Sequence, residues 1–296
     1  MRSFKITLSQ SFLILTVSLL SNALQAQGTP LPIEVLPLGK DIGVTSGQSV
    51  TPAFEGWYEN DDGSIALSFG YYNRNTEEVL SIPVGPANRI IGAPGGEANH
   101  GQPDRFEPGR HWGVFTVSLP AGSKAEVVWH LEDRGKTFHI PANLDPVYFI
   151  DAIAGDASKN FPPELRIPPG EKIGHGPTGV TAGPLSASVG KPLTVNIFAK
   201  DDGVGSELMA MFLGSGATVP PLELHWFKQQ GPGNAVFGTP EAKVPVAGGT
   251  ATTTVTFDAP GSYLLRARVN DLSGVENGGQ FQCCWSNGFI RVNVSN

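Results

Sequence analysis

The sequence has little charge and little cysteine, and it is slightly acidic. Charged residues make up 16% of the 296 residues, with 20 lysines and arginines against 27 aspartates and glutamates. Such a chain lacks the basic surface that nucleic-acid binding requires. We therefore expect no nucleic-acid partner. No run outside the N-terminal segment is long enough to span a membrane, so we expect no transmembrane segment in the mature chain.

The motifs of several enzyme classes are also missing. The chain has no G-x-S-x-G, no G-x-x-x-x-G-K-[ST] and no close pair of histidines such as H-x-H or H-E-x-x-H. We therefore assign no catalytic residue, no metal ligand and no cofactor. A hydrolase with paired carboxylates stays open, because its two acids can lie far apart in the sequence. Its candidates are Glu55, Glu59, Glu126 and Glu132.

Glycine and proline are abundant, with 37 and 25 residues. At this density they interrupt most helices, and the absence of a G-x-y period excludes a collagen-like chain. The hydrophobic fraction of 40% is enough for a packed core. Together with many short alternating segments, this predicts an all-β fold with two β-sandwich domains.

The N-terminus is typical of a secretory signal peptide. Arg2 and Lys5 precede a short apolar run over residues 12–20, and Ala23-Leu-Gln-Ala26 follows as a cleavage site. Removal of residues 1–26 leaves 18 positive and 27 negative charges, a net charge of −9. We expect an exported protein, periplasmic or extracellular, that begins with a Pro-rich leader over residues 27–40.

The first sandwich domain is predicted over residues 41–153. Asn60-Asp-Asp-Gly63 is a turn sequence between the alternating segments 54–58 and 64–72, which indicates a β-hairpin. Further strands are expected at 79–82, 113–119, 125–131, 137–140 and 147–150. Gly92–Arg110 has few aliphatic residues and is predicted to be a long surface loop. Residues 154–184 are rich in proline and glycine and are predicted to be a semi-rigid linker.

The second sandwich domain is predicted over residues 185–296. Leu193, Val195 and Ile197 alternate with polar residues, and Trp226 lies in another alternating segment. Asp258, Gly261 and Tyr263 match the tyrosine-corner pattern. This half resembles the immunoglobulin-like sandwich of bacterial PKD-type modules, but Leu265 stands where antibody-type domains have cysteine. The first half, with its segments 54–60 and 69–75, looks similar to secreted bacterial proteins of no known activity.

Adjacent aromatic residues suggest a binding surface in the first domain. In a strand, neighbouring side chains face opposite ways, so one residue of each adjacent pair must point away from the core. Exposed aromatic rings can stack on sugars or anchor a protein. With His100 in the long loop and His111 directly after it, the candidate ligand-binding residues are Trp57, Tyr58, Tyr71, Tyr72, His100, His111 and Trp112. His130 and His225 are expected to be exposed strand residues.

Three smaller features have alternative interpretations. His100 and His111 can form a metal or acid–base site with Glu97, Asp104 or Glu107, or belong to a solvated loop. Asp61-Asp62-Gly63 and Asp201-Asp202-Gly203 can bind Ca²⁺, although Asp-Gly is above all a turn signal.

The only cysteines, Cys283 and Cys284, are adjacent. In an oxidising compartment they can form a strained disulfide, stay reduced, or take a redox or soft-metal role.

These observations favour a secreted, non-catalytic binding or envelope-associated protein. Its expected partner is an extracellular protein or glycan, held by the first domain and the loop Gly92–Arg110. One alternative is a secreted polysaccharide hydrolase with its site on the first domain. The other is a structural spacer, which would have no cavity.

Overall fold

The computed structural model describes residues 44–60, 62–151, 153, 159–204, 220–271 and 284–296. These residues belong to one compact unit, residues 44–296. The predicted signal peptide, leader and Cys283 lie outside the described residues. No helix in the described part of the chain is long and apolar enough to cross a membrane.

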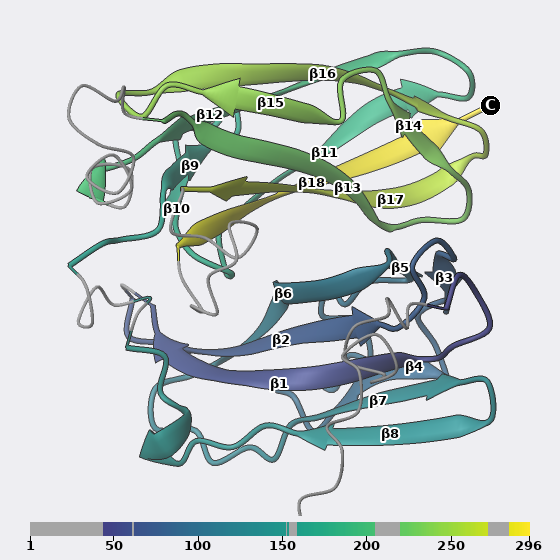
Figure 1. Cartoon of the computed structure of the whole chain (residues 1–296), viewed down its shortest axis with the longest axis vertical. Helices are drawn as coiled ribbons and strands as arrows, with labels where there is room; N and C mark the ends of the chain where they lie inside the picture. The colour runs from purple at the N-terminus through teal and green to yellow at the C-terminus, as the bar shows by residue number, and fades with distance from the viewer. Residues whose placement is uncertain (1–43, 61, 152, 154–158, 205–219, 272–283) are drawn as a thin grey trace, which may run out of the picture. The chain divides into compact units, whose positions relative to one another are not determined.

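The first sandwich packs one three-stranded sheet on another. One sheet has the order β1-β2-β6 and the other the order β4-β7-β8, with a small β3-β5 ribbon beside them (Figure 1). Their aromatic core centres on Phe115, whose ring lies 5.3 Å from Phe69 and 5.0 Å from Trp129. The strands are β1 (Val50–Glu59), β2 (Ile65–Asn73), β3 (Leu80–Ser81), β4 (Asn88–Ile91), β5 (Arg105–Phe106), β6 (Gly109–Leu119), β7 (Val128–Asp133) and β8 (Lys136–Pro141).

The predicted hairpin is present, and it contains a bulge. Strands β1 and β2 pair from Val50↔Asn73 to Glu59↔Ile65, with a register shift between Phe54 and Gly56. A bulge leaves one residue of the strand without a partner and redirects its side chain. That residue is Glu55, which is buried.

The second sandwich consists of two five-stranded sheets, in the orders β10-β9-β12-β16-β14 and β11-β18-β17-β13-β15 (Figure 1). Its core includes the predicted Val195, Ile197, Trp226 and Leu265. The strands are β9 (Glu164–Arg166), β10 (Ile173–Gly174), β11 (Val180–Ser188), β12 (Leu193–Lys200), β13 (Leu222–Gln230), β14 (Ala235–Phe237), β15 (Glu241–Val244), β16 (Gly249–Phe257), β17 (Gly261–Asn270) and β18 (Trp285–Ser295). The predicted fold class, all-β with two sandwiches, is confirmed.

The tyrosine corner is also formed. The Tyr263 hydroxyl donates to the carbonyl oxygen of Ala259 at 2.9 Å and accepts from the Gly233 N–H at 3.1 Å. The bond to Ala259 reaches four residues back along the chain, as the pattern predicts. The bond to Gly233 ties the loop after β13 to the same ring.

Two predicted segments differ from the structure. The predicted linker, residues 154–184, contains β9, β10 and the start of β11, because its apolar residues Leu165, Ile167 and Val180 are buried in the core of the second sandwich. Residues 147–150 were expected to be a strand. Instead, Pro146–Tyr148 forms a 3₁₀ turn, capped by the Asp145 side chain, which accepts from the Val147 N–H.

Candidate functional site

The predicted aromatic residues do not form one surface. Tyr58 and Tyr71 are buried, and Tyr72 is 45% exposed. The Tyr58 hydroxyl accepts from the Thr178 N–H at 2.8 Å, and that of Tyr71 accepts from the Glu107 N–H at 3.0 Å. Two further rings are partly buried against neighbours of their own domain. Trp57 packs edge-on against Phe149, and Trp112 lies under the Arg110 guanidinium.

His100 and His111 bind backbone rather than each other. His100 Nε2 lies 2.9 Å from the Glu97 carbonyl oxygen, and His111 Nε2 lies 3.0 Å from that of Pro108. Burial, followed by the charge of Arg266, lowers the pKa of His111 to about 3. Among the described residues, no group of three or more His, Cys, Asp or Glu could hold a metal ion.

The loop Gly92–Arg110 docks on the second sandwich. The Asp104 N–H donates to the Gln229 carbonyl oxygen at 2.9 Å, and the Asp104 carboxylate accepts from the Gly231 N–H at 2.7 Å. The Gln230 side chain donates to the Gln102 carbonyl oxygen at 2.6 Å. The loop therefore helps to hold the two sandwiches together, through hydrogen bonds at Gln102 and Asp104. Its expected role in ligand binding stays a prediction.

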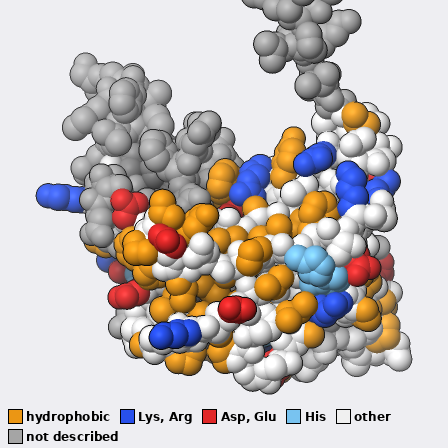
Figure 2. All heavy atoms as spheres, turned by 90° about the horizontal axis from the view of Figure 1, so that it is seen from below, with side chains coloured by type: hydrophobic (Ala, Val, Ile, Leu, Met, Phe, Trp, Pro, Cys, Tyr) orange, Lys and Arg blue, Asp and Glu red, His pale blue; other side chains and the backbone are white. Residues whose placement is uncertain are grey.

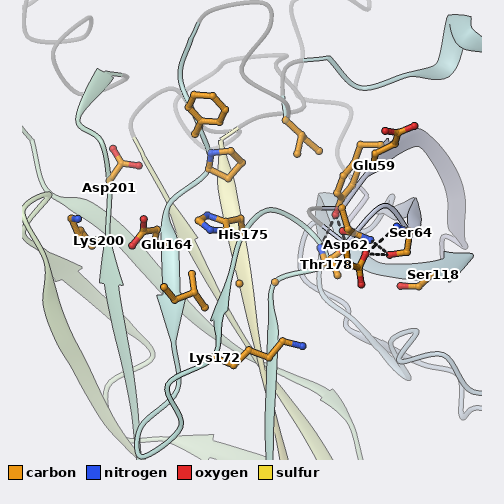
Figure 3. A pocket seen from close by; sticks show the side chains of 18 of the residues that line it. Glu59, Asp62, Ser64, Ser118, Glu164, Lys172, His175, Thr178, Lys200 and Asp201 are labelled. Atoms are coloured by element: carbon orange, nitrogen blue, oxygen red, sulfur yellow. Dashed lines mark hydrogen bonds between the residues drawn. The ribbon is translucent and has the colours of Figure 1, made fainter. Parts of the chain in front are cut away.

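A cleft with a volume of about 1140 Å³ lies where the two sandwiches meet. Its residues come from both sandwiches: the β1–β2 turn, the segment before β9, strand β10 and the end of β12. In Figure 3, Glu164, Lys200 and Asp201 lie on one side, and Glu59, Asp62 and Ser64 lie on the other. Of the seven residues predicted to bind ligand, only Tyr58 lines the cleft.

Both predicted Asp-Asp-Gly turns reach this cleft. Asp62 belongs to one and Asp201 and Asp202 to the other. Asp62 stabilises its own turn, because its Oδ1 accepts from the N–H and hydroxyl of Ser64. Asp61 lies outside the described residues. The turns were recognisable in the sequence, but their convergence depends on packing between the sandwiches, which no local pattern encodes.

Asp201 is the acid with the most unusual surroundings in the cleft. Only 8% of the residue is exposed; Oδ2 accepts from the Gly203 N–H at 2.8 Å, and Oδ1 has no hydrogen-bond partner among the described residues. Burial, reinforced by the charges of Asp271 and Asp202, raises the pKa of Asp201 to about 7. Near neutral pH this carboxyl group can therefore act as acceptor or donor.

The rest of the lining combines charge with apolar surface. Carboxylates outnumber ammonium groups, with Glu59, Asp62, Glu164, Asp201 and Asp202 against Lys172 and Lys200. Phe161 and Ile173 also line the cleft, and they are 52% and 48% exposed. An apolar platform beside several hydrogen-bonding groups is the usual composition of a small-molecule site.

The four glutamates that the sequence offered as candidates for a hydrolase lie in different parts of the first sandwich. Glu55 is buried in an ion pair with Arg110 at 2.8 Å, and it accepts from the Gly113 N–H at 2.5 Å. Glu59 lines the cleft. Glu126 is exposed, and Glu132 accepts from His130. The four acids therefore do not form one site.

His130 is buried, contrary to the expectation of an exposed strand residue. Its strand β7 is the central strand of its sheet, where Arg89 and His139 are its partners on the two neighbouring strands, and the His139 ring packs against it. His225 is partly exposed and lies 3.6 Å from Glu241.

Cys284 is buried and disulfide-bonded. Because Cys283 lies outside the described residues, the bridge between the two adjacent cysteines stays a prediction.

No family model matches the chain, and no curated protein matches it. Among solved structures, it is similar to the D00–D0 domain of intimin, with 12% identity over 84% of this chain and 100% of that one, at a TM-score of 0.27. It is also similar to the D0–D1 domain of intimin, with 13% identity over 83% of this chain and 98% of that one, at a TM-score of 0.26. Domains 4 and 5 of the S-layer protein SbsC are 13% identical over 61% of this chain and 69% of that one, at a TM-score of 0.23. At these values the likeness carries no argument about function.

Proposed function

We propose that the protein is an exported, non-catalytic binding protein that holds a neutral glycan segment in the cleft between its two sandwiches. The observation that carries this proposal is the cleft itself, built from both sandwiches and lined by carboxylates, lysines and exposed apolar side chains. Its volume of about 1140 Å³ is sufficient for an oligosaccharide.

The lining supports a neutral, hydroxyl-rich ligand. Carboxylates accept hydrogen bonds from sugar hydroxyls, and Lys172 and Lys200 can donate to sugar oxygens. Phe161 offers a ring face on which a sugar can pack. The excess of carboxylates disfavours an anionic polysaccharide, because like charges repel at short range.

A second candidate is a polysaccharide hydrolase, and Asp201 favours it. A carboxyl group with a raised pKa can serve as the general acid of a glycosidase, with a second carboxylate such as Glu164 as its partner. No tryptophan is among the described residues that line the cleft, which limits sugar stacking equally in both candidates.

The test measures binding and cleavage in parallel. Neutral oligosaccharides are screened by thermal shift and calorimetry, and their chain length is followed by mass spectrometry. We expect binding without cleavage, weakened by Glu164→Gln but not by Glu126→Gln, an exposed matched control outside the cleft. Cleavage that Asp201→Asn abolishes would establish the hydrolase instead. Absence of any binding, or equal binding by both variants, would refute the glycan site.

A further inference from the structure

A pair of histidines faces each other across the hairpin of β7 and β8, outside the cleft. His130 and His139 are direct partners in the antiparallel register. Their Nδ1 atoms lie 3.3 Å apart, and their ring centroids lie 4.8 Å apart. His139 is exposed, and histidine side chains reach the surface on the face of the molecule shown in Figure 2. The sequence spacing alone does not show this pair, because the two residues meet only through the strand register.

Glu132 fixes the tautomer of His130, so that the nitrogen facing His139 carries no proton. Its Oε1 lies 2.8 Å from Nε2 of His130. A carboxylate accepts a hydrogen bond, so Nε2 carries the proton and Nδ1 of the neutral ring presents its lone pair to His139. Histidines that bind metals are oriented in this way, with the other ring nitrogen donating to a carboxylate.

We propose that His130 and His139 form a surface chelate for a divalent transition-metal ion such as Zn²⁺ or Cu²⁺. Two nitrogens bound to one tetrahedral Zn²⁺ at about 2.0–2.1 Å lie about 3.3 Å apart. The observed separation of the Nδ1 atoms, 3.3 Å, already matches this spacing. Without a metal, the Nδ1–H of His139 donates to the Nδ1 lone pair of His130. Metal binding requires this proton to leave Nδ1 of His139, so that both Nδ1 atoms offer a lone pair to the ion.

The chemistry of the pair selects the class of metal. Imidazole nitrogens bind Zn²⁺, Cu²⁺ and Ni²⁺, whereas Ca²⁺ and Mg²⁺ prefer oxygen. Because no third His, Cys, Asp or Glu completes the site among the described residues, water fills the other positions. Arg89 pairs with His130 from β4, so its positive charge opposes metal binding, while the charge of Glu132 favours it.

The experiment titrates Zn²⁺ into the metal-free, untagged chain by calorimetry and records the electron paramagnetic resonance spectrum with Cu²⁺. We expect one ion per chain and hyperfine structure from two nitrogens, with no binding of Ca²⁺ at this pair. His139→Ala should weaken Zn²⁺ binding by at least about tenfold, and Glu132→Gln by about tenfold. His139 and Glu132 are exposed, so their variants should fold.

His100→Ala is the control, because this histidine belongs to the long loop and its Nε2 contacts the Glu97 carbonyl oxygen rather than the β7–β8 hairpin. It should leave the Zn²⁺ affinity unchanged, and Arg89→Gln should increase it. The proposal is wrong if Zn²⁺ does not bind, if His139→Ala binds as tightly as the parent chain, or if the Cu²⁺ spectrum shows fewer than two nitrogen ligands. Because the pair lies outside the cleft, none of these results bears on glycan binding.

Discussion

The side-chain amide of Asn287 donates a hydrogen bond to the carbonyl oxygen of Gly113, 2.7 Å away. Gly113 belongs to β6, the edge strand of its sheet, which pairs only with β2 among the described strands. Gln229 caps the same edge, since its amide donates to the Val114 carbonyl oxygen at 3.1 Å. The second sandwich thus protects an exposed edge of the first, with side chains in place of a strand.

Arg266 holds both amides in position. Its Nε donates to the Gln229 Oε1 at 3.0 Å, and its Nη1 donates to the Asn287 Oδ1 at 3.3 Å. The guanidinium also lies over the Phe227 ring, 4.4 Å from its centroid. Burial lowers the pKa of Arg266 to about 10, which leaves the group charged at neutral pH.

Asn287→Leu should therefore destabilise the protein by roughly 1–3 kcal/mol, because it leaves buried carbonyl groups without donors. The free energy of unfolding from urea titrations measures this. Asn293→Leu, an exposed position on the same strand, should change it by no more than about 0.5 kcal/mol. Equal effects at both positions would contradict the capping role.

Tyr263→Phe should cost about 1 kcal/mol, the net contribution of a hydrogen bond. The substitution removes the hydroxyl that contacts Ala259 and Gly233 and keeps the ring in the core. Calorimetric melting provides the measurement. An unchanged midpoint would show that the tyrosine corner adds nothing to stability.

Sequence alternation predicts which side chains of a strand are exposed when one face of the strand is buried and the other faces solvent. Leu265, Ala267 and Val269 show the expected alternation in β17. Arg266 and Arg268 lie between them and resemble solvent-facing residues, yet both are buried against the first sandwich. Alternation cannot show that both faces of a sheet are covered.

The site was harder to predict for a related reason. The two Asp-Asp-Gly turns are local signals, but they lie more than 100 residues apart in the chain and meet at the cleft only through packing of the sandwiches. Tyr58 and Tyr71 point into packed regions and Tyr72 is exposed, which agrees with alternation, because it requires only that one residue of each pair face outward. The ligand-binding role of the aromatic residues stays a prediction.

Glu55 should make stability depend on pH. Burial raises its pKa from 4.5 to about 7, although Arg110 and the Gly113 N–H oppose the shift. The folded state then keeps a proton that the unfolded state releases. The stability that Glu55 contributes is therefore full below about pH 4.5 and is lost as the pH rises to about 7.

Glu55→Gln removes this titration. The free energy of unfolding of the parent chain should fall relative to the variant by roughly 1–3 kcal/mol between these two pH values, and the difference should stay constant above them. Urea titrations across the range measure it. A parent chain that gains stability relative to Glu55→Gln as the pH rises would reverse the assigned sign.

The adjacent cysteines should be joined to each other. Cys284 is disulfide-bonded, and Cys283 is the only other cysteine in the chain. Freshly isolated protein that is alkylated without reductant should show the mass of the unmodified chain and gain two adducts after reduction. Two adducts before reduction, or a dimer that reductant separates, would rule out the bridge.

Asp201→Asn should stabilise the protein at and above neutral pH. Burial and the charges of Asp271 and Asp202 raise the pKa of Asp201 to about 7, so ionisation opposes folding once the pH passes the unfolded value of 3.8. The gain in the free energy of unfolding over the parent chain should be absent near pH 3.8 and reach roughly 1–3 kcal/mol above pH 7.

Asp258→Asn provides a control of opposite sign, since hydrogen bonds from Asn234 lower the pKa of Asp258. That variant should be less stable than the parent at neutral pH and should approach it in acid. If urea titrations show that Asp201→Asn loses stability as the pH rises, the carboxylate of Asp201 must be held by a favourable partner, and its role as a proton donor in the cleft would have to be abandoned.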